Sequence, residues 1–171
     1  MRRLLQASAF GLVLAASAQA APGDQATAEL KNLQGQAIGT VTLTETPHGI
    51  LLSGELGRLP PGPHGVHLHA VGKCEPPFTS AGGHFNPANH KHGFMAAEGP
   101  HAGDLPNLHA APDGKATVDA FAAGVTLAGA QGLLDQDGAS LVVHAKADDY
   151  KTDPAGDSGD RIACGVLEKS R

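Results

Sequence analysis

Short runs of alternating or β-branched apolar residues, separated by glycine and proline, occupy most of the chain after residue 20. The pattern predicts strands over residues 26–32, 38–45, 50–56, 66–70, 116–121, 140–145 and 161–167. Turn sequences lie between several of them, at residues 34–36, 47–49, 113–114 and 137–138. A Pro-Pro-Gly-Pro run at 60–63 interrupts the chain, and no convincing helical period follows residue 20. With 23 glycines, the sequence favours an all-β sandwich or barrel.

Two long segments lack this alternation. Residues 72–112 are rich in Gly, Pro, Asn and His, and residues 148–160 are polar and acidic. Because loops of this length inside a compact domain are usually functional, we predict two functional loops on a β scaffold.

The first 20 residues have the composition of a secretory signal peptide. Arg2 and Arg3 precede a short, mostly apolar stretch, and Ala18-Gln19-Ala20 fits an A-x-A cleavage site. The stretch is shorter than the roughly 20 apolar residues that a membrane-spanning helix needs. We therefore expect cleavage after Ala20, export, and one domain over residues 21–171 without a membrane anchor. An uncleaved amphipathic N-terminus is the alternative.

Charge excludes one class of partner. Without Arg2 and Arg3 the chain has 10 basic against 17 acidic residues, a formal charge of −7. No basic patch is visible, so we exclude nucleic-acid binding.

The two cysteines, Cys74 and Cys164, indicate a disulfide if the protein is exported. Such a bond closes a loop of about 90 residues. The alternative is a thiolate metal site. It is weaker, because Cys164 lies far in sequence from the histidines and the chain has no C-x-x-C motif.

Seven residues form the strongest chemical pattern: His67, His69, His84, His92, His101, Asp104 and His144. Six of the ten histidines belong to this set. Neutral imidazole is the commonest protein ligand for copper and zinc, and a carboxylate can complete a zinc set. Seven ligands are too many for one tetrahedral site, but they suffice for two metals if one ligand is shared.

The first part of this pattern lies on predicted strands. His67 and His69 are two residues apart on one strand, so their side chains share a face and can bind one ion. His144, at the end of another apolar strand, can supply a third imidazole. For the H-x-H pair alone, two surface histidines on a half-exposed strand are the alternative.

The second part lies in the first long loop. Within 21 residues it has the donors of a structural zinc site: His84, His92, His101 and Asp104. A solvated polar loop is the alternative. If His84 is shared, one metal has four nitrogens, which suits copper(II), and the other has three nitrogens and one oxygen, which suits zinc. The spacing permits this bridge without proving it.

At this level of detail the chain resembles the copper,zinc superoxide dismutases, and most closely their exported bacterial branch. The matching stretches are 65–69 (GVHLH), 80–87 (SAGGHFNP), 91–93 (KHG), 99–105 (GPHAGDL), 141–149 (LVVHAKADD) and 159–167 (GDRIACGVL). The resemblance implies an eight-stranded antiparallel Greek-key β-barrel or sandwich located in the periplasm. It also implies an oxidoreductase, with one copper and one zinc per subunit, that converts superoxide to O2 and hydrogen peroxide.

The resemblance also implies individual roles. The implied copper ligands are His67, His69, His84 and His144. The implied zinc ligands are His84, His92, His101 and Asp104, with His84 as the bridge and a catalytic proton donor. Asp148 is expected to link His67 to His92, and Arg161 to dock the anionic substrate beside copper. Cys74 and Cys164 are expected to pair and hold the loop near Arg161. A surface ion pair with Asp157 or Asp160 is the alternative role for Arg161.

A non-catalytic copper and zinc carrier on the same fold is the main alternative function, and a β-domain without chemistry is a third. All four implied copper histidines and Arg161 are present, which favours the enzyme. Apart from Met1, only Met95 could supply the soft thioether ligands expected of a copper store.

The sequence leaves several points open. It assigns no role to His64 or His90, and we expect His64 to be solvated in a loop. It does not identify which lysine guides superoxide, and the candidates are Lys73, Lys146 and Lys151. Exported members of the family include monomers and dimers, so a homodimer is an open alternative.

Overall fold

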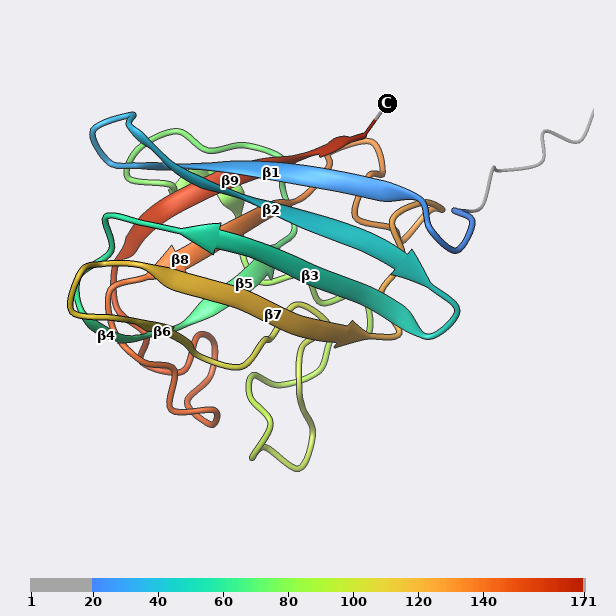
Figure 1. The fold of residues 1–171 in the computed structure, drawn as a ribbon. Helices are drawn as coiled ribbons and strands as arrows, with labels where there is room; N and C mark the ends of the chain where they lie inside the picture. Colours follow the sequence, from blue (N-terminus) through green and yellow to red (C-terminus); the bar gives the residue numbers. More distant parts are fainter. Residues whose placement is uncertain (1–19, 171) are drawn as a thin grey trace, which may run out of the picture.

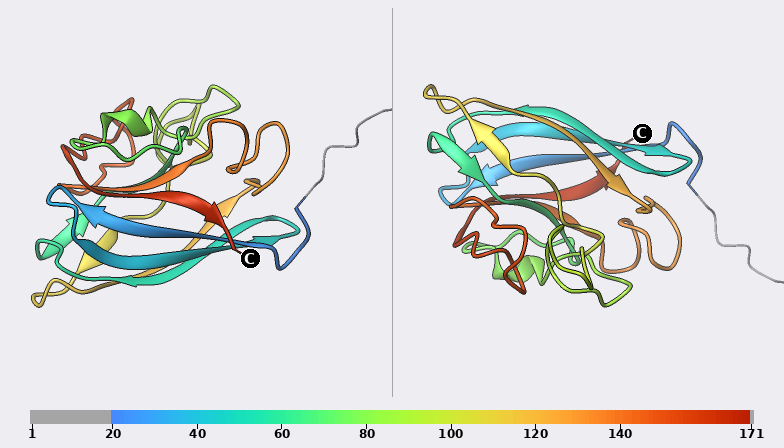
Figure 2. Two further views of the ribbon diagram at one scale, coloured as in Figure 1. Left: turned by 90° about the horizontal axis from the view of Figure 1, so that it is seen from above. Right: turned by 90° about the horizontal axis from the view of Figure 1, so that it is seen from below.

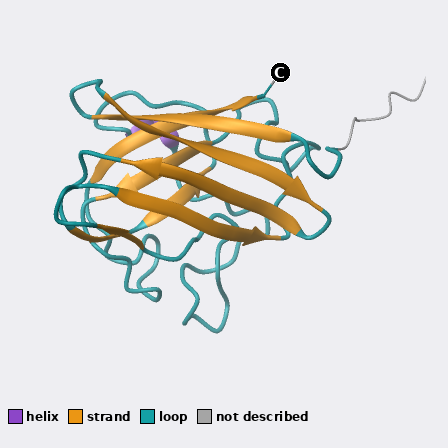
Figure 3. Ribbon diagram, in the orientation of Figure 1, coloured by secondary structure: helices purple, strands orange, loops and turns teal. Residues whose placement is uncertain are grey.

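The computed structural model describes residues 20–170, which consist almost entirely of antiparallel strands joined by loops (Figures 1 and 3). The strands are β1 (Gln25–Asn32), β2 (Ala37–Thr46), β3 (Gly49–Leu56), β4 (Gly62–His64), β5 (Val66–His69), β6 (Leu108–Ala110), β7 (Ala116–Ala123), β8 (Ser140–His144) and β9 (Arg161–Lys169). All seven predicted strands are present, and the predicted all-β antiparallel fold is confirmed. The predicted signal peptide, except Ala20, lies outside the described residues.

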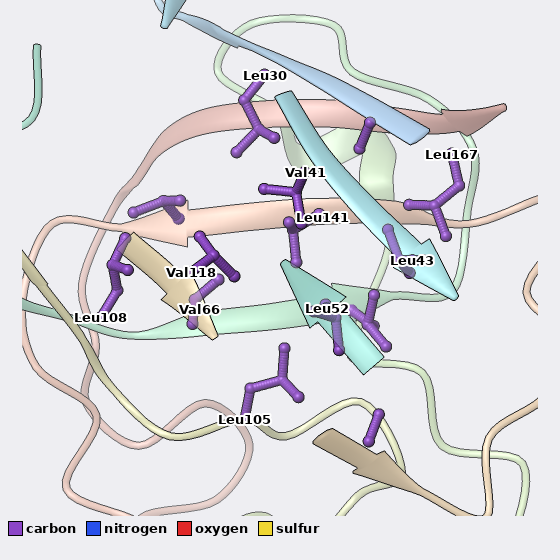
Figure 4. Packing of buried hydrophobic residues seen from close by; sticks show 14 of the residues in the cluster. Leu30, Val41, Leu43, Leu52, Val66, Leu105, Leu108, Val118, Leu141 and Leu167 are labelled. Atoms are coloured by element: carbon purple, nitrogen blue, oxygen red, sulfur yellow. The ribbon is translucent and has the colours of Figure 1, made fainter. Parts of the chain in front are cut away.

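Seven strands form one curled sheet with the order β5-β8-β9-β1-β2-β3-β7. The sheet bends so that β5 and β8 lie behind β3 and β7, and Figure 2 shows the resulting two layers. Alternation explains the packing, because in β1 every second side chain (Ala26, Ala28 and Leu30) is fully buried while its neighbours are not. These side chains belong to one core together with Leu52 of β3, Val118 of β7 and Leu141 of β8, so the core includes side chains from both layers (Figure 4).

Two short strands were not predicted. β4 lies at the predicted Pro-Pro-Gly-Pro break and β6 lies inside the first predicted loop, and they pair as a separate two-stranded ribbon. Each has only three residues, and Pro63 has no N–H to donate, so neither carries a strand signal of its own. The described residues therefore contain nine strands rather than eight.

The two long loops lie on the same side of the sheet, next to β8 and β5 (Figure 2). One joins β5 to β6 and contains a single turn of 3-10 helix, η1 (Thr79–Ala81), and the other joins β8 to β9. The predicted disulfide is present: Cys74 in the first loop bonds Cys164 in β9, with Cα atoms 5.7 Å apart. Within residues 20–170, no helix is long and apolar enough to cross a membrane.

Candidate metal centre

Strand β5 brings the two parts of the histidine pattern together. Along one edge it pairs with β8, which ends at His144. Along the other edge the first loop runs antiparallel to it, with Asp104 opposite His67 and His84 opposite His69. Residues from three distant parts of the sequence therefore meet around four residues of one strand, and all four of these strand residues are buried.

The first group, which we call the four-histidine set, consists of His67, His69, His84 and His144. Each residue supplies a ligand nitrogen within 4.8 Å of the others. Four of their nitrogens are buried without a hydrogen-bond partner: Nδ1 of His67 and Nε2 of His69, His84 and His144. Because unpaired buried polar atoms are costly, their convergence fits a bound metal, and nitrogen donors suit copper.

The second group, the aspartate set, consists of His84, His92, His101 and Asp104. Oδ1 of Asp104 lies 2.8 Å from Nδ1 of His84, 3.1 Å from Nδ1 of His92 and 3.3 Å from Nδ1 of His101. The other oxygen, Oδ2, accepts the backbone N–H groups of Gly93 and His101 at 2.8 Å and 3.0 Å. Three nitrogens and one carboxylate oxygen that point at one place fit zinc.

His84 is the only residue common to both groups. Its Nδ1 belongs to the aspartate set, and its Nε2 is one of the unpaired nitrogens of the four-histidine set. The geometry thus has the form of a shared imidazole between two adjacent metal positions.

Asp148 lies between the two groups on their outer side. It accepts a hydrogen bond from Nε2 of His67 at 2.7 Å and another from Nε2 of His92 at 2.9 Å. Both bonds use Nε2, which leaves Nδ1 of each ring directed toward its own group.

Backbone carbonyl groups orient two other rings. Nδ1 of His69 donates to the carbonyl oxygen of Gly82 at 3.0 Å, and Nδ1 of His144 donates to that of Gly159 at 3.1 Å. The sequence patterns did not indicate these glycines, because a carbonyl group carries no side-chain signal.

Burial sets the charge of the rings. It lowers the pKa of His67 to about 4 and that of His144 to about 3, so both are neutral at pH 7 in the metal-free protein. Neutral imidazole is the metal-binding form. His92 is different: burial lowers its pKa, but hydrogen bonds with Asp104 and Asp148 outweigh burial and raise the pKa to about 9.

Arg161, the first residue of β9, lies beside the four-histidine set. It donates from one terminal nitrogen to the carbonyl oxygen of Phe78 at 2.7 Å and from the other to that of Gly82 at 2.6 Å. Gly82 also holds His69, so the arginine and a ring of the set share one acceptor. Among the described residues Arg161 makes no ion pair with an aspartate. It lines a cleft of about 350 Å³ together with Leu33, Pro77, Thr79, Gly159 and Asp160.

The expectation that His64 is solvated is wrong. Its ring is 2 % exposed, with Nδ1 2.8 Å from the carbonyl oxygen of His144 and Nε2 2.7 Å from that of Pro60. Pairing of β4 with β6 buries the residue, and that pairing was not visible in the sequence. His90 is exposed, and its Nδ1 lies 3.1 Å from the carbonyl oxygen of Pro100.

The fold and the two groups define a class of protein: an antiparallel β domain with two adjacent, buried ligand groups that share a histidine and could each hold a metal ion. The family model described as copper/zinc superoxide dismutase matches residues 37–167. The chain belongs to this family.

Individual relatives support the same family membership. The chain is 49 % identical over 148 residues to the Cu-Zn superoxide dismutase of Caulobacter vibrioides, covering 84 % of this chain and 85 % of that one. It is 46 % identical over 145 residues to Cu-Zn superoxide dismutase 1 of Aquifex aeolicus, covering 82 % and 86 %. Among solved structures, a superoxide dismutase-like protein from Bacillus subtilis superposes with a TM-score of 0.79 at 41 % identity, covering 83 % of this chain and 97 % of that one.

Proposed function

We propose that the protein converts superoxide to O2 and hydrogen peroxide at a histidine-bridged site with one copper and one zinc per subunit. The four-histidine set holds copper and the aspartate set holds zinc. The observation that carries this assignment is the convergence of four buried, unpaired ring nitrogens, one of them on the histidine shared with the aspartate set. When bound, copper supplies the Cu(II)/Cu(I) couple that accepts an electron from one superoxide and returns it to a second.

Arg161 attracts and orients the anion. Its guanidinium group is charged at every working pH, and two backbone carbonyl groups fix its orientation at the cleft. Two of its five N–H donors are used in these bonds, which leaves others for an anionic oxygen. Arg161 therefore places a fixed positive charge next to the four-histidine set, with which it shares the Gly82 carbonyl group.

His84 moves a proton. Nε2 faces the four-histidine set while Nδ1 stays in the aspartate set, so Nε2 can take up a proton without the ring leaving its place. A proton on Nε2 then faces the four-histidine set, where the second superoxide would need protons to leave as hydrogen peroxide.

Asp148 fixes the four-histidine set relative to the aspartate set. Its two oxygens hold His67 of one set and His92 of the other, so neither ring can rotate without losing a buried charge-assisted hydrogen bond.

We further propose that the protein is a periplasmic antioxidant enzyme whose signal peptide is cleaved after Ala20. The composition of residues 1–20 and the disulfide support export, since disulfides persist in oxidising compartments. Superoxide, the substrate, is the only partner that this proposal requires. In the proposal, the protein is not attached to the membrane once the signal peptide has been removed. A homodimer is the alternative to a monomer, and sedimentation equilibrium distinguishes the two.

The test is superoxide decay catalysed by the mature protein, residues 21–171 with the disulfide intact. The copper- and zinc-loaded form should accelerate decay strongly, and the zinc-only form should not. A fully loaded protein without activity would instead indicate a copper and zinc carrier.

A further inference from the structure

The outer ring nitrogen of each proposed metal ligand has a partner, with one exception. Asp148 holds His67 and His92, and backbone carbonyl groups hold His69 and His144. Both nitrogens of His84 belong to the two sets. Nε2 of His101 has no hydrogen-bond partner among residues 20–170, and the one carboxylate oxygen within 4.0 Å of it there is Oδ1 of Asp153.

Asp153 belongs to the second loop, yet its carboxylate contacts three residues of the first. Oδ1 accepts the backbone N–H of His92 at 3.0 Å, and Oδ2 lies 3.4 Å from Nζ of Lys91. The same Oδ1 lies 4.0 Å from Nε2 of His101. One side chain therefore contacts the backbone of one proposed zinc ligand and faces the ring of another.

We propose that Asp153 is a positioning residue for the zinc half of the site. It fixes the backbone of His92 and presents a negative charge to the outer nitrogen of His101. This inference rests on the zinc assignment of the proposed function. When Nδ1 of an imidazole holds a metal, Nε2 carries the ring proton, and an outer carboxylate facing it orients the ring and strengthens the ligand.

The two contacts differ in strength. The bond to the His92 N–H is a charge-assisted hydrogen bond of ordinary length. At 4.0 Å the contact with His101 is electrostatic only, and solvent weakens it because the Asp153 side chain is 44 % exposed. Most of the effect should therefore come through His92, and a smaller part from the charge facing His101.

Two substitutions separate these parts. Asp153→Asn keeps an oxygen that can accept the His92 N–H but removes the charge, whereas Asp153→Ala removes both. The matched control is Asp157→Asn, at an exposed position of the same loop whose side chain makes no hydrogen bond or ion pair with other described residues. Its φ of 49° is one that asparagine adopts readily.

The experiment follows zinc loss from the copper- and zinc-loaded mature protein in excess EDTA, with bound zinc measured by elemental analysis over time. We expect release from Asp153→Ala to be about 10- to 100-fold faster than from the unaltered protein, with Asp153→Asn between the two. Asp157→Asn should stay within about twofold of the unaltered protein. In protein loaded with cobalt(II) in place of zinc, the visible bands should shift in both Asp153 variants and not in the control.

Zinc release from Asp153→Ala at the unaltered rate, with unchanged cobalt bands, would overturn the inference while leaving the proposed function intact. If the unaltered protein takes up no zinc, or if His101→Ala retains zinc as tightly, the zinc assignment itself is wrong and the inference falls with it.

Discussion

Nδ1 of His64 lies 2.8 Å from the backbone carbonyl oxygen of His144, 80 residues away in the sequence. The other ring nitrogen, Nε2, lies 2.7 Å from the carbonyl oxygen of Pro60. The ring thus joins the segment before β4 to the end of β8, where the chain presents a proposed copper ligand. Since the ring is buried and both its nitrogens are engaged, His64 has a structural reason to be present.

We therefore predict that His64→Ala destabilises the protein and loosens copper. The substitution removes the ring nitrogen that contacts the buried His144 carbonyl oxygen, and leaving that oxygen without a donor should lower the free energy of unfolding by roughly 1–3 kcal/mol. Urea unfolding measures this loss, and the Cu(II) electron paramagnetic resonance spectrum reports on the geometry at His144. The exposed His109→Ala is the control. Unchanged stability and an unchanged copper spectrum would show that the His64 contacts are dispensable.

The strands and the ligand pattern could be predicted, whereas contacts between loops could not. A strand such as β1 is visible in the sequence because apolar and polar residues alternate along it, and the ligands are visible because their residue types are known metal donors. β4 and β6 show neither feature, because each is three residues long and forms only by pairing with the other, with Pro63 opposite His109, 46 positions later in the sequence. Asp153 is likewise one acidic residue among several in a polar loop, and its contact with His92 depends on how the two loops fold against each other.

Arg161→Ala should slow superoxide decay about tenfold or more and weaken inhibition by azide, with both metals still bound. The reason is the loss of the fixed positive charge beside the four-histidine set. Stopped-flow decay and azide titration of the copper absorption band measure the two effects. Arg161→Lys should recover part of the rate, because lysine keeps the charge but not the paired donor geometry.

The control for this prediction is Arg58→Ala, which removes an exposed arginine elsewhere on the surface. An unchanged decay rate for Arg161→Ala, at full metal content, would remove Arg161 from the mechanism.

Lys146 is the lysine that we expect to guide superoxide. Its aliphatic stem lies against Gly159, which lines the same cleft as Arg161, and no carboxylate among the described residues pairs with it. Lys73, another candidate, is paired with Glu75 at 3.1 Å. Lys146→Glu should therefore reduce the bimolecular rate severalfold at low ionic strength, with a smaller difference in high salt.

The matched control for Lys146 is Lys169→Glu, which makes the same change in net charge at the exposed end of β9. Stopped-flow rates over a range of salt concentrations compare the two variants. Equal rate losses in both would mean that net charge, rather than the position of Lys146, governs the approach of superoxide.

The metal-free protein should be most stable near pH 6.5. Below this pH, His67 and His144 become protonated in the unfolded chain but stay neutral in the folded protein, because folding lowers their pKa values to about 4 and 3. Stability should fall as the pH drops from 6.5 to 4, with His67 alone contributing about 3 kcal/mol. The effect of His92 on stability has the opposite dependence on pH, because its pKa is raised to about 9. Its contribution to the free energy of unfolding is lost as the pH rises through 9. Urea unfolding of the disulfide-intact, metal-free protein from pH 4.5 to 9.5 measures both slopes, and a flat profile below pH 6.5 would contradict the buried neutral histidines.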